Sequence, residues 1–185
     1  RCCAFQAPLL MKKILHYGEY LVGDYPFAES LNQEVLERLK YAENIGHTNV
    51  KAQHTIWNWE PDNQKIINFK SYIKSEIEKN FRPTSVITGN SKKTEITSFW
   101  ANVYSKGDYA EKHNHKPFLY SFAYFVQCKW YDSPLIFTDS KIKIRPKNGR
   151  YVIFPSYLWH QVPKHRYNRS RVTLSGNLDK IYTAS

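Results

Sequence analysis

The sequence predicts a mainly β protein, a sandwich or jelly roll, with two N-terminal helices supporting one outer face of the sheet. From residue 84 onward the chain is rich in Thr, Val, Phe, Trp and Tyr, which favour strands. These runs are short and are separated by Gly, Pro, Asn, Asp or Ser. Many short strands with turn signals between them are typical of sandwiches and jelly rolls. Before residue 84 apolar residues recur at helical spacing, so we expect the N-terminal third to be mostly helical.

The first predicted helix lies between residues 28 and 44. Leu31, Val35, Leu39 and Ala42 recur there at helical spacing, and Pro26 suits the turn that enters the helix. Such a stripe predicts packing against a sheet.

The second predicted helix begins near residues 61–62. Ile66, Phe69, Ile73 and Ile77 form its apolar stripe. It should end before Pro83, because the residue that precedes a proline avoids helical backbone angles.

The remaining chain predicts a series of strands with no linker, repeat or low-complexity segment between them. The length of 185 residues also favours one domain. Met11 is the sole methionine and looks like a natural start, so we expect residues 1–10 to be an extension, 11–83 the helical support and 84–185 the β core. The predicted strands are 94–104, 118–127, 135–138, 141–144, 151–154 and 171–177.

Composition excludes several classes of protein and leaves others open. The net charge is +11, from 27 Lys and Arg against 16 Asp and Glu, which suits nucleic-acid binding or attraction to an anionic cosubstrate. The basic residues are scattered rather than gathered in one run, which favours the cosubstrate. Three cysteines, two of them adjacent, argue against a disulfide framework and predict a cytoplasmic protein. No apolar run is long enough for a membrane span. The oligomeric state stays open, a homodimer included.

Two predicted strands carry polar residues in an alternating pattern. Side chains at i, i+2 and i+4 of a strand share one face. Asn102 therefore lies on the same face as Trp100 and Tyr104, where a purely structural strand would favour an apolar residue. On the last strand a wholly polar face, which either meets solvent or lines a pocket, is formed by Arg171, Thr173, Ser175 and Asn177.

Three histidines have spacing that suits a metal site. His113 and His115 point the same way if that segment is extended. His160 follows a glycine turn, an apolar strand and Pro155, so the strand would deliver it to a site. Histidine is a common ligand of transition metals, but the H-x-H pattern alone is weak. His16, His47, His54 and His165 show no ligand spacing.

Taken together, these motifs resemble the 2-oxoglutarate/Fe(II)-dependent oxygenases, and most closely the small prolyl-hydroxylase-like branch of bacteria and phages. The resemblance covers residues 94–178 and implies a double-stranded β-helix core. It implies that His113 and His160 bind iron and that Arg171 pairs with the distal carboxylate of 2-oxoglutarate. The motifs that carry the resemblance are Trp100 to Tyr104, Gly107, His113 to His115, Phe154 to His160, and Arg171 to Asn177.

The resemblance also implies the chemistry and the remaining site residues. Asn102, Tyr104 and Thr173 match positions that help to hold the cosubstrate, and Tyr124, Trp100 and Ser175 are expected to line the same pocket. Fe(II), 2-oxoglutarate and O2 would then hydroxylate a peptide prolyl residue or another substrate, a small molecule included, with release of succinate and CO2. Nucleic acid is a less favoured substrate.

His115 departs from the family pattern, which usually has Asp at this position. Three interpretations compete: His115 is a third neutral ligand, it lies behind the ligands while water or substrate completes the site, or the chain is an inactive relative. Asp108 and Glu111 lie nearby in the sequence but at the wrong offset.

Two other classes remain as alternatives. Gly107 followed by His113-x-His115, and Gly149 followed by Pro155 and His160, fit the two halves of a cupin motif, which would make a three-histidine iron dioxygenase. Such a cupin lacks the expected Glu and has no need for Arg171. The other alternative is a non-catalytic basic module in which Trp57, Trp59 and Trp130 bind nucleic acid or a peptide.

Overall fold

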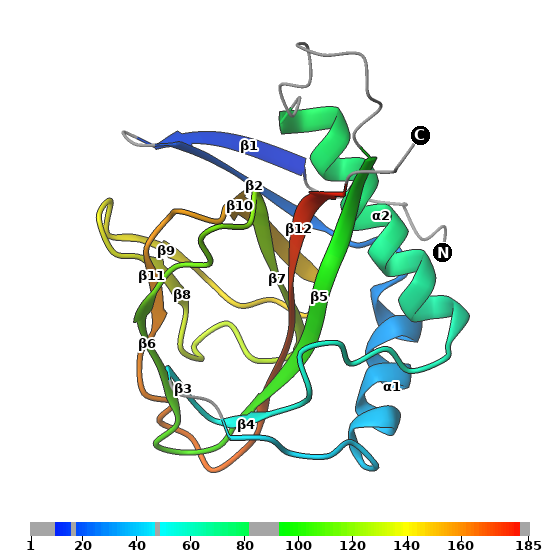
Figure 1. Ribbon diagram of the computed structural model, residues 1–185. Helices are drawn as coiled ribbons and strands as arrows, with labels where there is room; N and C mark the ends of the chain where they lie inside the picture. The colour runs from blue at the N-terminus through cyan, green and yellow to red at the C-terminus, as the bar shows by residue number, and fades with distance from the viewer. Residues whose placement is uncertain (1–9, 16–17, 47–48, 82–92, 182–185) are drawn as a thin grey trace, which may run out of the picture.

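The computed structural model of the chain describes residues 10–15, 18–46, 49–81 and 93–181 (Figure 1). Residues 1–9 of the expected extension lie outside this part, and Leu10 begins the first strand. The described chain forms two antiparallel sheets and two helices, which confirms the predicted mainly β class and the jelly-roll architecture.

The larger sheet has seven strands and the smaller sheet has five. In spatial order the larger sheet contains β1 (Leu10–Leu15), β2 (Gly18–Asp24), β10 (Arg150–Pro155), β7 (Tyr120–Gln127), β12 (Arg171–Ile181), β5 (Lys93–Tyr104) and β4 (Gln53–His54). The smaller sheet contains β3 (Val50–Lys51), β6 (Tyr109–His113), β11 (His160–Val162), β8 (Leu135–Phe137) and β9 (Ile142–Ile144).

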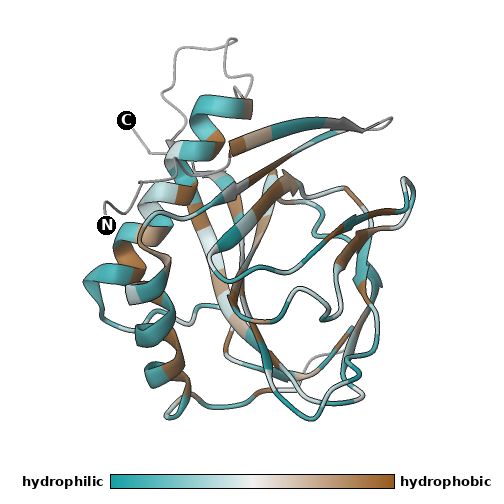
Figure 2. Cartoon of the chain, turned by 180° about the vertical axis from the view of Figure 1, so that it is seen from behind, coloured by the Kyte–Doolittle hydropathy of each residue, from teal (hydrophilic) through white to brown (hydrophobic). Residues whose placement is uncertain are grey.

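Both predicted helices cover the outer face of the larger sheet (Figure 1). They are α1 (Ala28–Leu39) and α2 (Gln64–Phe81), and both follow the predicted apolar stripes. Figure 2 shows their brown apolar sides turned toward the sheet and their teal sides turned outward. Leu31 and Val35 of α1 and Phe69 and Ile73 of α2 are buried in one cluster with the outward side chains of β7 and β12.

Phe69 is the central contact between α2 and the sheet, so its truncation tests this layer. Its ring lies 4.6 Å from that of Tyr124 and 6.0 Å from that of Phe122, measured between centroids. We expect Phe69→Ala to lower the free energy of unfolding by about 3–5 kcal/mol, because it leaves a cavity in a packed layer. Ile67→Ala on the same helix is the control, since Ile67 is 46% exposed and should change stability little. Urea denaturation measures both, and equal losses would contradict the packing described here.

A second apolar layer fills part of the space between the two sheets. Phe125, Val152 and Phe154 of the larger sheet pack there against Leu135 and Phe137 of the smaller one. This layer does not extend along the whole of β5 and β12, whose inward side chains are largely polar. A cavity lies in that region.

The N-terminal part of the chain corrects one prediction. Residues 11–83 were expected to be a mostly helical support, yet they also supply most of β1 and all of β2, β3 and β4, which join the two sheets. The β core therefore does not begin at residue 84. β6 and β11 are further strands that the sequence did not predict. β3, β4 and β11 have only two or three residues and so carry little periodic signal, whereas β2 is a longer strand with four consecutive buried residues. Within the described residues, no helix has the length and apolar character that crossing a membrane requires.

Candidate metal and cosubstrate site

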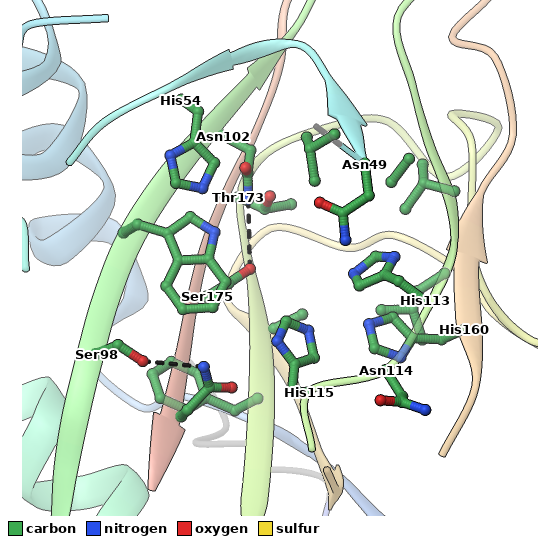
Figure 3. A pocket seen from close by; sticks show the side chains of 18 of the residues that line it. Asn49, His54, Ser98, Asn102, His113, Asn114, His115, His160, Thr173 and Ser175 are labelled. Carbon is green, nitrogen blue, oxygen red and sulfur yellow. Dashed lines mark hydrogen bonds between the residues drawn. The ribbon is translucent and has the colours of Figure 1, made fainter. Parts of the chain in front are cut away.

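A cavity of about 440 Å³ lies between the two sheets and brings the predicted site residues together (Figure 3). The smaller sheet contributes His113 and His160, and His115 follows the end of β6. The larger sheet contributes the inward faces of β5 and β12, which are Ser98, Trp100, Asn102 and Tyr104, and Arg171, Thr173, Ser175 and Asn177. The polar face of the last strand therefore lines a pocket rather than meeting solvent.

The register of β5 and β12 explains why the predicted cosubstrate residues meet. The two strands are antiparallel neighbours, and Arg171 lies opposite Tyr104 while Thr173 lies opposite Asn102. Ser175 lies opposite Trp100 in the same way. Because alternate side chains share a face, these pairs all point into the space between the sheets.

The three histidines converge from two strands and a turn. His113 ends β6 and lies opposite His160, which begins β11. His115 is held by its backbone N–H, which donates to the Ser156 carbonyl oxygen at 2.8 Å. One ligand nitrogen from each ring lies within 4.8 Å of the other two, so the three side chains could hold one metal ion.

Hydrogen bonds fix the tautomer of two of these rings. Nδ1 of His113 lies 2.7 Å from the Glu111 carbonyl oxygen, and Nδ1 of His160 lies 2.9 Å from the Leu158 carbonyl oxygen. A carbonyl can only accept, so each Nδ1 carries the proton and each Nε2 keeps the lone pair that binds a metal. Burial, together with the neighbouring His113 and His115, holds the pKa of His160 well below its usual range. Its neutral form is the form that coordinates metal.

No carboxylate joins this group of ligands among the described residues. Asp108 instead accepts a hydrogen bond from the Ser105 backbone N–H at 2.7 Å, and the Glu111 side chain is exposed. Neither residue near His115 in the sequence therefore supplies the missing charge. The three histidines would leave a bound divalent ion with its full positive charge.

Arg171 is a buried cation that lines the same cavity. Its side chain is 1% exposed, and its Nε and Nη1 atoms have no hydrogen-bond partner among the described residues. The guanidinium carbon lies 4.7 Å from the ring centroid of Tyr104 and 5.4 Å from that of Phe125. Burial lowers the pKa of Arg171, although the nearby Tyr104 opposes that shift. A buried charge with unsatisfied donors is unfavourable by itself, so this geometry suits an anionic ligand.

Neutral polar groups line the wall between Arg171 and the histidines. The Asn102 amide donates to Ser175 Oγ at 3.4 Å, while Asn102 Oδ1 has no partner within the described chain (Figure 3). Further along, the Asn177 amide donates to Ser98 Oγ at 2.9 Å (Figure 3). The Trp100 indole N–H is also buried without a partner among the described residues. These groups could bind the polar atoms of a ligand.

Tyr124 corrects the prediction that it lines the pocket. It lies on β7 opposite Leu174, and both side chains belong to the core beneath the helices. Its hydroxyl donates to Asn32 Oδ1 of α1 at 2.7 Å. The neighbouring side chains Ala123 and Phe125 pack in the layer between the sheets instead. The physical reason is strand alternation, which turns Tyr124 toward the helices.

The cavity also has a wall formed by residues that the sequence did not predict to lie at the site. Asn49, His54 and Trp57 come from the segment around β3 and β4, and Asn114 and Lys116 flank His115. The buried His54 ring stacks on Trp100 at 5.7 Å, and the Trp57 ring meets Trp100 edge-on at 4.7 Å (Figure 3 labels His54). Trp57 is 40% exposed at this wall. Strands of two residues leave no periodic pattern, so no sequence signal could have placed this wall.

The glycines of the cupin-like pattern have a backbone role. Gly107 and Gly149 have φ values of +96° and +84°, in the left-handed region that side chains disfavour. At Gly149 an added Cβ would also lie 2.5 Å from the Ala28 side chain. Turn geometry accounts for both glycines without a cupin motif.

One protein-family model matches part of the chain. Residues 136–177, which include His160 and Arg171, match the sequence model of the family described as "Putative 2OG-Fe(II) oxygenase". No curated protein sequence matches the chain.

Solved structures share the fold at low sequence identity. The viral collagen prolyl hydroxylase of Paramecium bursaria Chlorella virus-1, solved with 2-oxoglutarate, is 13% identical with a TM-score of 0.67, over 86% of this chain and 94% of that one. A prolyl-4-hydroxylase of Pseudomonas putida is 13% identical with a TM-score of 0.62, over 83% and 88%. HygX of Streptomyces hygroscopicus, solved with nickel and 2-oxoglutarate, is 8% identical with a TM-score of 0.59, over 86% and 82%.

Proposed function

We infer that this chain, which shares the fold of the 2OG-Fe(II) oxygenases and matches their sequence model over residues 136–177, is a 2-oxoglutarate- and Fe(II)-dependent dioxygenase. One observation carries the inference: a group of three histidines and a buried arginine with unsatisfied donors face the same cavity. The first suits a metal ion and the second suits an organic anion.

The histidines fit iron in the residue types that they offer. His113, His115 and His160 would hold Fe(II) through imidazole nitrogens and leave other coordination positions open, as an oxygenase requires. The hydrogen bonds to the Glu111 and Leu158 carbonyls orient two of the rings before any metal binds. We propose His115 as the third ligand because no carboxylate is placed to take its position among the described residues.

Arg171 fits the distal carboxylate of 2-oxoglutarate. Its planar guanidinium can donate two parallel hydrogen bonds to a carboxylate, and the bound anion would neutralise the buried charge. The Tyr104 ring lies against the guanidinium, and Asn102 and Thr173 supply polar groups on the same face of the sheet.

The residues of the cavity have positioning and exclusion roles in the reaction. When both are bound, iron and 2-oxoglutarate supply an oxidising centre that uses O2 and yields succinate, CO2 and a hydroxylated product. Arg171 fixes one end of the cosubstrate, so that its other end is directed toward the histidines across the cavity. Trp100 and Phe154 line the space between and exclude water from it.

The substrate that we propose is a peptide, with prolyl hydroxylation as the leading reaction. Two of the solved structures that share the fold are named prolyl hydroxylases. Trp57 offers a partly exposed aromatic ring beside the cavity, on which a proline ring could pack. We also propose a reducing, cytoplasmic location, consistent with the buried free thiol of Cys128.

Turnover of 2-oxoglutarate tests the proposed function. The protein is incubated in air with Fe(II), 2-oxoglutarate and a proline-rich peptide, and succinate is quantified while the peptide mass is measured. We expect succinate to form with Fe(II) and a peptide mass gain of one oxygen atom; the same peptide with alanine in place of proline is the control. Succinate with no peptide product would reject the peptide substrate and retain the oxygenase. No succinate from folded, iron-loaded protein would favour a cupin-type dioxygenase or a non-catalytic binding module.

The role of His115 has its own prediction. Because a carboxylate is also a good iron ligand, His115→Asp should retain metal binding, and it should lower the net charge of the loaded site by one. His115→Ala should weaken metal binding by more than about 100-fold, beyond the 10- to 100-fold loss that removal of a residue behind the ligands normally causes. Calorimetric titration with Ni(II) measures both variants. An unchanged affinity of His115→Ala would place His115 outside the ligand set.

A further inference from the structure

Loops that connect strands of the two sheets form a basic-aromatic patch, which shares no residue with the cavity. The segment between β7 and β8 contributes Trp130 and Tyr131, and the segment between β11 and β12 contributes Tyr167 and Arg169. The second of these segments is the orange chain along the lower edge of Figure 1. The patch is defined as these four residues with Lys106, Lys129, Lys164 and Arg166, which lie in or beside the same loops.

The aromatic part of the patch is exposed yet ordered by contacts. Trp130, Tyr131 and Tyr167 are 69%, 43% and 39% exposed. The Tyr131 and Tyr167 rings lie 4.9 Å apart, and the Arg169 guanidinium lies 5.2 Å and 5.5 Å from their centroids. The buried Asp132 carboxylate pairs with Arg169 and accepts a hydrogen bond from the Lys129 backbone N–H. The platform is therefore preorganised, and Trp130 extends it edge-on at 5.6 Å from Tyr131.

Hydrogen bonds join the basic residues of the patch to the same loops. The Gly107 backbone N–H, next to Lys106, donates to the His165 carbonyl oxygen at 2.8 Å. The Lys164 carbonyl oxygen accepts a hydrogen bond from Ser133 Oγ at 3.0 Å. The ammonium group of Lys164 lies 5.6 Å from the Tyr109 ring centroid. The segments that carry the four flanking cations are therefore joined to one another, although they are separated in the sequence.

These flanking cations lack the counter-charges that other surfaces of the chain have. On α2, Lys65, Lys70 and Lys74 each lie beside a glutamate. None of Lys106, Lys129, Lys164 and Arg166 forms such an ion pair within the described residues, although all four are exposed. The carboxylates in or beside the patch are Asp132, which Arg169 neutralises, and Asp108, which is bound to the Ser105 backbone. The patch keeps a net positive charge.

We propose that the basic-aromatic patch binds single-stranded nucleic acid. Exposed rings can stack on unpaired bases, and the surrounding cations can contact the phosphates that connect them. A duplex keeps its bases stacked on one another, so it would use the cations and leave the rings without partners. The proposal is independent of the oxygenase site, because the two share no residue.

Fluorescence anisotropy with a labelled oligothymidylate of about 15 nucleotides tests the proposal, since this length spans a typical site. We expect Trp130→Ala to weaken binding about tenfold, because stacking on one base contributes about 1–3 kcal/mol, and Trp130→Phe to restore most of it. Lys129→Ala with Arg166→Ala should lower the slope of log affinity against log salt by about 1.4, or about 0.7 for each lost phosphate contact.

Two matched controls separate the patch from the overall charge of the chain. Tyr41, 82% exposed beyond α1, is an aromatic control, and Lys143, exposed on β9, is a charge control. Tyr41→Ala should leave affinity unchanged, and Lys143→Ala should leave the salt slope unchanged. The proposal is overturned if the controls lose as much affinity as the patch variants or if no binding is detected at low salt. A duplex, or vesicles of anionic phospholipid, bound more tightly than the oligothymidylate and equally dependent on Trp130 would also overturn it.

Discussion

Replacing Arg171 by methionine is expected to weaken 2-oxoglutarate binding about 100-fold or more while leaving metal binding intact. The loss of a charged group that binds a buried carboxylate typically costs about 2–5 kcal/mol, or about 30- to 4,000-fold in affinity, and the nearly complete burial of Arg171 favours the upper part of this range. Methionine can occupy the space between the Tyr104 and Phe125 rings without a charge. Calorimetric titration of the Ni(II)-loaded protein with 2-oxoglutarate measures the effect.

Arg171→Met should also stabilise the ligand-free protein, which replacement of an arginine with a purely structural role would not do. In the ligand-free protein Arg171 is buried with two unsatisfied donor atoms among the described residues. Removing this charge should raise the free energy of unfolding by about 1 kcal/mol, since buried charges are often less stable than apolar groups of similar size. Arg169→Met is the matched control. It leaves the buried Asp132 unpaired, so it should lower stability while 2-oxoglutarate affinity stays unchanged.

Loss of His160 is the second large expected effect, this time on metal binding. His160 is 4% exposed, and its ring is oriented by the Leu158 carbonyl. We expect His160→Ala to lower Ni(II) affinity by about 100-fold or more, beyond the 10- to 100-fold loss that accompanies removal of a residue behind the ligands. Calorimetry with Ni(II), which is stable in air, avoids oxidation during the measurement.

Asn114→Ala is the control for this prediction. Asn114 lines the cavity between His113 and His115 in the sequence, but it is not part of the group that could hold metal. Its substitution should leave Ni(II) affinity unchanged. If His160→Ala retained wild-type affinity for Ni(II), His160 would not be a metal ligand and the proposed iron site would be rejected.

The sequence predicted best where periodicity is strong. Leu31 and Val35 in α1, and Phe69 and Ile73 in α2, repeat with the helical period because each helix has one buried face. Alternation likewise grouped the residues of β5 and β12 that share one face, because β12 has a polar side and an apolar side. For the strand that carries Arg171, alternation left open whether this face met solvent or lined a pocket, and only the family resemblance favoured the pocket.

The sequence predicted poorly where a strand is apolar on both sides. β7 is buried along nearly its whole length, so alternation does not distinguish the face of Tyr124 from that of Ala123 and Phe125. The pairing of Tyr124 with Leu174 decides the face, and that register depends on long-range contacts. The wall around His54 and Trp57 was missed for a different reason, because β3 and β4 have two residues each.

Binding of 2-oxoglutarate to the iron-loaded protein, followed by absorption spectroscopy without oxygen, tests the central claim most directly. Iron on the three histidines and a 2-oxoglutarate molecule anchored by Arg171 would meet in one cavity. We predict that 2-oxoglutarate produces a new visible band in the Fe(II) protein, that the band saturates with one equivalent, and that it is lost in Arg171→Met. A folded, iron-loaded protein that gives no band and no heat of binding with 2-oxoglutarate would contradict the account.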